Sequence, residues 1–247
     1  MNGEVVIVTW AARVLGRSYA LGLAGNGYAV VVADIADPGP VVDEIENAGG
    51  TALGLPVDVS DPDSTRELAD RTLERFGRID LLVNNAGYMT DILKQPFEEI
   101  SPAEWDHCMA VNVRGTWLCC RAVVPTMKRQ RSGKIVNTSS ATVPSGVPGF
   151  LHYVSSKAAI VGLTRALARE LGEWNIRVNT ISPDYIPHDP DYHARQPEMA
   201  SLIREQRCLK RDATPEDVVG TILYLAGHGS DFVTGQDFWV NGGRLFH

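Results

Sequence analysis

The 247-residue sequence contains few cysteines, and their spacing gives them no shared role. The four cysteines form no C-x-x-C pair, and no cluster of histidines accompanies them. Structural zinc sites and disulfide frameworks depend on such spacing. The sequence therefore predicts no metal site, and it predicts reduced cysteines that are partly buried in helices.

Runs of positive charge are missing as well. No run of Lys or Arg exceeds two residues, and the formal net charge is -7. Nucleic acids and anionic membranes attract proteins mainly through clustered basic side chains. We therefore expect neither of these as a partner, and we expect a small-molecule substrate instead.

The sequence also shows no pattern of a targeting segment or of a linker. The amino terminus, M-N-G-E-V-V-I-V-T, enters a strand pattern at once, without the basic region and apolar stretch of a signal peptide. No internal repeat, low-complexity tract or Gly/Ser linker interrupts the chain. We therefore expect a cytoplasmic protein whose residues 1–247 form a single domain.

What is present is an alternation of apolar, β-rich runs with helical stretches, which is typical of a parallel sheet covered on both faces. The predicted strands are Val5–Thr9, Ala29–Ala33, Thr51–Val57, Leu81–Asn84, Lys134–Thr138, Ile176–Ile181 and Phe238–Asn241. The predicted helices lie near Gly16–Gly25, Pro40–Ala48, Pro62–Phe76, Pro102–Met127, Tyr153–Leu171 and Pro215–Ala226. The pattern predicts an α/β fold with a doubly wound, parallel, seven-stranded sheet of the Rossmann type.

One polar stretch, residues 188–211, breaks this alternation before the last predicted helix. Ligands of such sheets bind at the carboxyl ends of the strands. A segment inserted there is predicted to cover the substrate. The alternative is a solvated loop and helix without substrate contact.

Tyr153 and Lys157 lie four residues apart at the start of an Ala- and Leu-rich run, and Ser140 precedes them. Positions four apart share one face of a helix, so the Lys157 ammonium favours the ionised form of the Tyr153 phenol. A phenol whose free pKa is roughly 10 thereby becomes usable near neutral pH. This constellation suggests carbonyl chemistry, although a lone pair of this kind is more often an ordinary feature of a helix surface.

The first predicted strand runs into Thr9–Gly16, where a dinucleotide-binding fold has its glycine-rich turn. Asp34 follows the second predicted strand. A carboxylate there accepts hydrogen bonds from both ribose hydroxyls of NAD and repels the 2′-phosphate of NADP. The alternative is that Asp34 only caps a turn.

With these features the chain resembles the short-chain dehydrogenase/reductase family over essentially its whole length, in particular its NAD-dependent alcohol dehydrogenases and 3-oxoacyl reductases. The matching motifs are N-N-A-G at 84–87, V-N-V at 111–113, Ser140 with Y-x-x-x-K at 153–157, D-V at 58–59, R-V-N at 177–179, and V-T-G-Q…V-N-G-G near the carboxyl end. The resemblance implies an oxidoreductase that interconverts a secondary alcohol and a ketone, with NAD as cofactor. It also implies a homotetramer packed through the helices at 102–127 and 153–171.

The resemblance assigns catalytic roles to Asn112, Ser140, Tyr153 and Lys157. Ser140 would bond the substrate oxygen and Tyr153 would exchange a proton with it, while C4 of the nicotinamide exchanges hydride. Lys157 would also hold the nicotinamide ribose, and Asn112 would anchor a water on the proton path. The implied cofactor contacts are Thr9, Arg13, Leu15, Gly16, Asp34, Asp58 and Val59 (adenine), Asn84, Asn85, Ala86 and Gly87 (adenosine ribose), Tyr153, Lys157, and Ile186 (carboxamide).

Four positions depart from the family pattern, and all are expected to face the cofactor groove. Trp10 and Val14 stand at the first two glycines of T-G-x-x-x-G-x-G, so only Gly16 remains. Asp184 stands where the family usually has the glycine of P-G, and His188 where a threonine is common. Natural remodelling and deliberate alteration of the groove both explain this pattern.

Three functions therefore stay open: an alcohol dehydrogenase or ketone reductase, a binding or regulatory protein whose cofactor uptake is lost, and an isomerase or dehydratase that uses the same tyrosine. The residues expected to line the substrate site are Tyr88, Thr142, Val143, Phe150, His152, Tyr185 and parts of 188–211. The cations in that stretch, His193, Arg195, Arg204 and Arg207, either meet an anionic group or lie on a solvated helix face.

Overall fold

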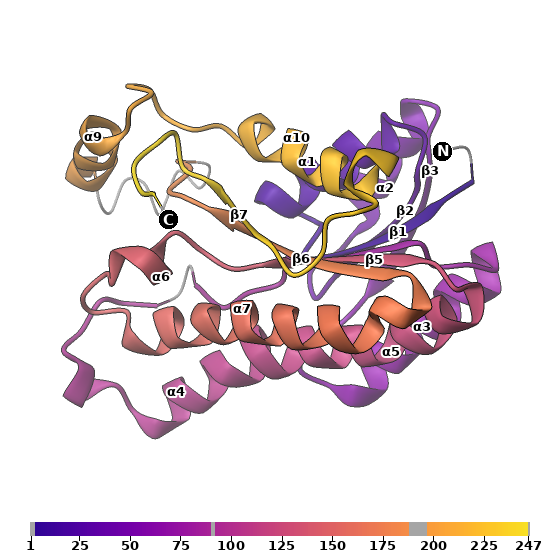
Figure 1. Ribbon diagram of the computed structural model, residues 1–247, viewed down its shortest axis with the longest axis horizontal. Helices are drawn as coiled ribbons and strands as arrows, with labels where there is room; N and C mark the ends of the chain where they lie inside the picture. Colours follow the sequence, from indigo (N-terminus) through magenta and orange to yellow (C-terminus); the bar gives the residue numbers. More distant parts are fainter. Residues whose placement is uncertain (1–2, 90–91, 188–196, 247) are drawn as a thin grey trace.

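The computed structural model describes residues 3–89, 92–187 and 197–246, and its backbone is built around one parallel sheet (Figure 1). The strands are β1 (Val5–Thr9), β2 (Ala29–Asp34), β3 (Thr51–Pro56), β4 (Leu81–Asn84), β5 (Gly133–Thr138), β6 (Ile176–Pro183) and β7 (Asp237–Val240). Their order across the sheet is β3-β2-β1-β4-β5-β6-β7, and every neighbouring pair is parallel. The predicted Rossmann-like α/β fold is confirmed.

Helices cover both faces of the sheet. They are α1 (Val14–Ala24), α2 (Gly39–Asn47), α3 (Pro62–Phe76), α4 (Pro102–Met109), α5 (Thr116–Gln130), α6 (Thr142–Ser145), α7 (Leu151–Leu171), α9 (Pro197–Gln206) and α10 (Glu216–Ala226). A π-helical turn, η2 (Ala110–Gly115), joins α4 to α5, and three 3₁₀ turns are η1 (Phe97–Glu99), η3 (Gly172–Trp174) and η4 (His228–Ser230). Among the described residues, no helix is long and apolar enough to cross a membrane.

The core consists of two layers, because successive side chains of a strand point to opposite faces. Val6 and Val8 of β1 pack in the layer that contains α1, α2 and α10. Val5 and Ile7 pack in the opposite layer with α3, α5 and α7. Figure 1 shows the two groups of helices above and below the sheet. Burial on both faces explains why β1 and β2 are almost uninterrupted runs of apolar residues.

The strand order reverses between β1 and β4, which lie side by side although two strands separate them in the sequence. In doubly wound sheets, ligands bind at the carboxyl edge beside such a reversal. The segments that leave β1, β4, β5 and β6 at this edge carry most of the predicted site residues.

Three elements differ from the sequence-based prediction. The helix expected at 102–127 is divided by η2 and continues to Gln130, while α6 and α9 were not predicted. In η2 the Asn112 carbonyl accepts a hydrogen bond from the Thr116 hydroxyl at 2.8 Å. A π-turn places one extra residue in the helix and leaves no trace in hydrophobic periodicity, so the sequence did not reveal it.

Candidate active site

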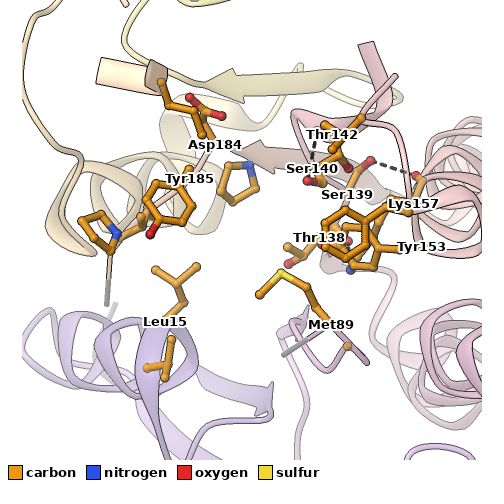
Figure 2. A pocket seen from close by; sticks show the side chains of 18 of the residues that line it. Leu15, Met89, Thr138, Ser139, Ser140, Thr142, Tyr153, Lys157, Asp184 and Tyr185 are labelled. Atoms are coloured by element: carbon orange, nitrogen blue, oxygen red, sulfur yellow. Dashed lines mark hydrogen bonds between the residues drawn. The ribbon is translucent and has the colours of Figure 1, made fainter. Parts of the chain in front are cut away.

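The carboxyl ends of β1, β4, β5 and β6 border one cavity (Figure 2). The cavity has a volume of about 170 Å³ and opens to solvent. The predicted site residues that line it are Leu15, Asn85, Gly87, Ser140, Tyr153, Lys157 and Ile186. The predicted residues outside the lining are Thr9, Arg13, Gly16, Asp34, Asp58, Val59, Asn84, Ala86 and Asn112.

The turn between β1 and α1 holds two residues in the left-handed region of backbone conformation. The angle φ is 55° at Trp10 and 54° at Val14, and these are the two positions where the glycine-rich pattern has glycine. Other residues disfavour this region, β-branched valine most of all. The strain is on the order of 1–3 kcal/mol per residue. The backbone therefore has the conformation of a glycine-rich turn, although Trp10 and Val14 disfavour that conformation.

Gly16 remains glycine because the turn packs against it. A Cβ atom there would lie 1.9 Å from the carbonyl oxygen of Trp10. Helix α1 begins beside it at Val14, and its N-cap residue, Arg13, makes no capping bond through its side chain. The first N–H groups of a helix attract anions. The turn thus keeps the backbone features that a pyrophosphate requires.

Thr9 and Asn85 tie the end of β1 to the end of β4. The Thr9 hydroxyl oxygen accepts hydrogen bonds from the backbone N–H groups of Asn85 and Ala86, each at 3.0 Å. The Asn85 amide donates to the carbonyls of Thr9 at 3.3 Å and Trp10 at 3.4 Å. The neighbouring Asn84 donates to Asn137 within the sheet instead. The ribose contact of Asn84 remains a prediction.

Asp34 is buried and binds the turn from the side of β2. One carboxylate oxygen accepts the N–H of Ala12 at 2.9 Å, and the other accepts the N–H of Ala36 at 2.9 Å. Asp34 thus caps the turn, as its alternative interpretation predicted. Each carboxylate oxygen retains a second lone pair, so the ribose contact remains a prediction.

Asp58 and Val59 follow β3, and they face different surroundings. Asp58 is exposed, and one of its carboxylate oxygens accepts bonds from the Ser60 N–H and hydroxyl at 2.8 and 2.7 Å. Val59 is buried against Gly115, where an added Cβ would lie 2.8 Å from a Val59 methyl group. Their adenine contact remains a prediction.

Tyr153 and Lys157 stand on one face in the first turns of α7, as their spacing predicted. The Lys157 ammonium lies 5.8 Å from the centre of the Tyr153 ring and donates to the Thr138 carbonyl at 2.9 Å. Burial lowers the pKa of Lys157 from 10.5 to about 8, because a buried ammonium loses its hydration. A cation is thereby held close to the phenol inside the protein.

Ser140 follows β5 and faces the same cavity as Tyr153. Its hydroxyl oxygen accepts a hydrogen bond from the Thr142 N–H at 3.2 Å. The preceding Ser139 donates to the Lys157 carbonyl at 2.8 Å, so the end of β5 is fastened to α7. Sequence reasoning missed Ser139, whose only signal is its position next to Ser140.

Asn112 is fully buried behind the cavity. Its side-chain oxygen accepts the Tyr88 N–H at 2.7 Å, and its amide donates to the Tyr88 carbonyl at 3.3 Å and the Ser156 hydroxyl at 2.9 Å. Asn112 therefore fastens the loop after β4 to α7. Its predicted water contact remains a prediction.

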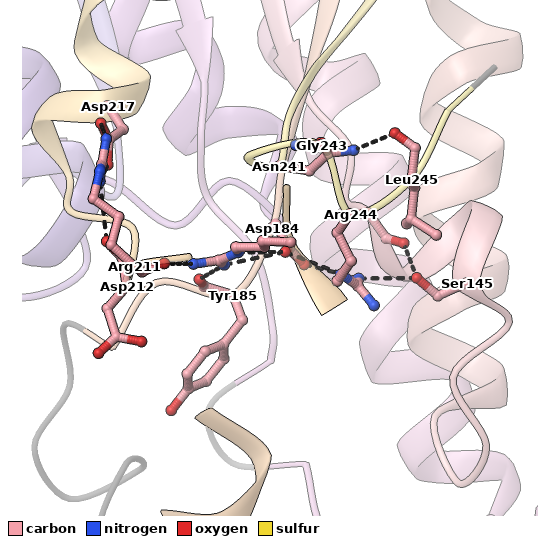
Figure 3. A network of polar contacts seen from close by, with 12 residues as sticks. Ser145, Asp184, Tyr185, Arg211, Asp212, Asp217, Asn241, Gly243, Arg244 and Leu245 are labelled. Atoms are coloured by element: carbon pink, nitrogen blue, oxygen red, sulfur yellow. Dashed lines mark hydrogen bonds and ion pairs between the residues drawn. The ribbon is translucent and has the colours of Figure 1, made fainter. Parts of the chain in front are cut away.

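Asp184 forms a buried ionic cluster in place of an ordinary turn (Figure 3). Its carboxylate accepts bonds from Arg207 at 3.1 and 3.3 Å and from Arg244 at 2.8 and 3.0 Å. Arg207 is 2% exposed, so the prediction of a solvated helix face is wrong for it. Arg204 instead pairs with Asp212 at the surface. His188, His193 and Arg195 lie outside the described residues.

The residues predicted to line the substrate site are brought together only in part. Thr142, Phe150 and Tyr185 line the cavity, whereas Tyr88, Val143 and His152 do not. His152 is fully buried with Nε2 3.3 Å from Glu104. His152 and Tyr153 are consecutive residues of α7, and consecutive helix residues point in different directions. His152 therefore points away from the cavity that Tyr153 lines. Met199 and Ile203, which belong to the segment 188–211 expected to border the substrate, also line the cavity. Sequence reasoning missed the lining residues Met89, Lys94, Val147 and Arg244.

The cavity provides groups that fit a dinucleotide. On one side of the cavity lies the uncapped start of α1, and across from it lie Tyr153 and Lys157 (Figure 2). The buried hydroxyl oxygens of Thr138 and Thr142, both in the lining, have no hydrogen-bond partner in the described part of the chain. Buried hydroxyls are rarely left unpaired, so a ligand that bonds to them is favoured.

Comparison with known proteins gives the family. The sequence pattern of the family described as enoyl-(acyl carrier protein) reductase matches residues 11–244. The chain is 38% identical to the 3-oxoacyl-(acyl-carrier-protein) reductase FabG of Staphylococcus epidermidis, which covers 96% of this chain and 97% of that protein. It is 36% identical to the FabG of Thermotoga maritima, with 99% of each chain covered. The chain belongs to the short-chain dehydrogenase/reductase family of oxidoreductases.

Two solved structures are also similar. A protein of Sinorhizobium meliloti described as a short-chain alcohol dehydrogenase superposes with a TM-score of 0.92 at 30% identity, covering 99% of this chain and 97% of that chain. A protein of Beutenbergia cavernae described as an NAD(P)-dependent gluconate 5-dehydrogenase, with NADP bound at low occupancy, gives 0.91 at 34% identity and the same coverage. This second structure thus shows a nicotinamide cofactor on a relative of the chain.

Proposed function

We propose that this protein interconverts a secondary alcohol and a ketone by hydride transfer, with NAD as its cofactor. The observation that carries the proposal is the meeting of Ser140, Tyr153 and Lys157 in one cavity with the start of α1. A nicotinamide held there supplies or accepts the hydride at C4. Thr9, Gly16 and Asp34 would shape the pyrophosphate and ribose end, and Ile186 would meet the carboxamide.

Each catalytic residue has a separate task in the proton transfer. Ser140 orients the substrate oxygen, and Tyr153 donates a proton to it during reduction or removes one during oxidation. The Lys157 ammonium stabilises the phenolate that remains after donation. Asn112 keeps the loop after β4 and α7 in register, which fixes the Tyr153 ring relative to the cavity.

The names of the relatives support two substrate classes, 3-oxoacyl thioesters and hydroxy acids such as gluconate. Both classes share the alcohol-ketone conversion. We further propose a single cytoplasmic domain, with residues 188–211 next to the substrate, that assembles as a homotetramer through α4, α5 and α7. The exposed Trp117 side chain on α5 supports an apolar interface there.

The second candidate is a binding or regulatory protein whose cofactor uptake is impaired, and the strain at Trp10 and Val14 favours it. Turnover separates the two functions. We expect NADH oxidation with at least one ketone from a panel of oxoacyl thioesters, oxo acids and neutral ketones. Tyr153→Phe keeps the ring but loses the proton, so turnover should fall by ~10² to 10⁴ while NADH still binds.

Equal turnover by wild type and a folded Tyr153→Phe variant would contradict the catalytic role of the tyrosine. Absence of NADH binding, together with absence of turnover on every member of the panel, would favour the second candidate. Tryptophan fluorescence during NADH titration gives the binding measurement for both proteins.

A further inference from the structure

The cavity wall beside Ser140 carries more positive than negative charge. The ionisable residues of the described lining are three cations, Lys94, Lys157 and Arg244, and one carboxylate, Asp184. The protein as a whole is acidic, with a formal charge of -7. The positive charge of this wall is therefore a local property.

Asp184 does not neutralise its surroundings, because it is shared by two guanidinium groups. Arg207 and Arg244 both bond to its carboxylate, and the side chains of Asp184 and Arg244 are only 3% and 10% exposed. Arginine stays protonated in proteins. One positive charge of this cluster thus has no partner, and an unpaired buried charge is costly unless an anion approaches it.

The hydrogen-bonding capacity of Arg244 that no described residue uses lies on one nitrogen, Nη1. Its Nε bonds to Asp184, and its Nη2 bonds to Asp184 and to the Ser145 hydroxyl at 3.0 Å. No described residue accepts a hydrogen bond from Nη1 of Arg244. Nη1 is not among the fully buried polar atoms without a partner, and Arg244 lines the cavity. Two N–H bonds of Arg244 are therefore available to a ligand.

Arg244 lies on the substrate side of the cavity. Ser145, its partner, belongs to α6, which directly follows Ser140. Figure 2 shows Asp184, the other partner, across the cavity from Leu15 in the first turn of α1. The start of α1 is where a pyrophosphate binds. The charge at Arg244 is therefore suited to a second anion.

We propose that Arg244 binds a carboxylate of the substrate, so that the protein acts on an oxo acid and the corresponding hydroxy acid. Arg207 holds Asp184, and Asp184 holds the Arg244 side chain with Nη1 toward the cavity. This inference rests on the proposed alcohol-ketone conversion and narrows its substrate class.

Matched acids and esters test the inference. We compare 3-oxobutanoate and 5-oxohexanoate with their methyl esters in wild type, Arg244→Gln and Arg66→Gln. Arg66 is an exposed residue of α3, so its variant removes the same charge outside the cavity. We expect wild type to prefer an acid over its ester. Arg244→Gln should raise the KM for that acid about 30-fold and leave the ester unchanged.

A variant that keeps the positive charge distinguishes carboxylate binding by Arg244 from a packing role of its side chain. Arg244→Lys should recover part of the preference for the acid over its ester. A wild-type preference for the ester or for a neutral 3-oxoacyl thioester would overturn the inference. So would an equal rise in KM for acid and ester in Arg244→Gln.

A second measurement does not require turnover. Hexanoate should raise the Tm of wild type and of Arg66→Gln but not of Arg244→Gln, and the neutral analogue hexanamide should have less effect on all three. Equal shifts by hexanoate and hexanamide in wild type would overturn the inference. If no ketone is reduced, the proposed function fails, and the Tm measurement still decides whether Arg244 binds a carboxylate.

Discussion

Lys157 has a buried ammonium that the protein uses at a cost in stability. Its pKa falls from 10.5 to about 8 because burial removes water from the charge. Between these two values the unfolded chain binds more protons than the folded chain. The free energy of unfolding must therefore rise as the pH increases through this range.

We predict that Lys157 makes wild type more stable at pH 9.5 than at pH 7, relative to Lys157→Met. From the folded-state pKa of about 8 to pH 9.5 is about 1.5 pH units, over which the free energy of unfolding should rise by about 2 kcal/mol. Urea unfolding of both proteins at both pH values gives the difference, and methionine controls for all other titrating groups. A free energy of unfolding of wild type that falls relative to that of Lys157→Met as the pH rises would contradict the buried ammonium.

Asp34 places a second buried charge at the other end of the cofactor groove. Its carboxylate would lie next to the 2′-phosphate of NADP, where two like charges ~4 Å apart cost about 4 kcal/mol before screening and relaxation. We predict a higher kcat/KM with NADH than with NADPH.

Asp34→Asn should reduce this preference, because it removes the charge while an oxygen remains to accept the Ala12 N–H. Steady-state kinetics with both cofactors measures the effect. A higher kcat/KM with NADPH in wild type would show that Asp34 only caps the turn.

The turn from β1 to α1 combines a glycine-like backbone with two residues that strain it. Trp10 and Val14 both hold positive φ, and both line the cavity. We predict that Trp10→Gly/Val14→Gly binds NADH more tightly, because the strain is relieved and the isopropyl group no longer competes for space at the first turn of α1. A gain of ~1.4 kcal/mol is already tenfold in affinity.

Calorimetric titration of wild type and of the double variant with NADH measures this gain. Trp117→Gly serves as a control for replacing an exposed aromatic residue outside the cavity. Equal dissociation constants, or weaker binding by the double variant, would show that the turn is adapted to Trp10 and Val14.

At the level of helices and strands, the sequence predicted the elements that have a clear apolar periodicity or a buried apolar run. All seven strands were identified, most clearly β1, β2 and β4, whose residues are almost all buried. Helix α6 has only four residues, and α9 lies in a polar stretch, so neither gives a clear periodic signal. The left-handed backbone at Trp10 and Val14 lies at two positions where the family pattern has glycine.

Across the whole molecule, the sequence predicted the residues that share a short motif and missed those that meet through the fold. Tyr153 and Lys157 are joined by helical spacing. Arg244 contacts Asp184 and Ser145, which are 60 and 99 positions away. No local pattern connects such partners, and Asp184 was read as part of the cofactor groove although it joins the carboxyl-terminal segment to β6.

The fold brings the strained turn after β1 and the side chains of Ser140, Tyr153 and Lys157 to one cavity, and the central proposal is that hydride transfer takes place there. Incubation with a ketone and NADH that is deuterated at C4, followed by mass spectrometry of the product, tests this claim most directly. We predict an alcohol with deuterium on the former carbonyl carbon in wild type, and far less in Tyr153→Phe. A wild-type protein that binds NADH and transfers no deuterium to any ketone would contradict the account.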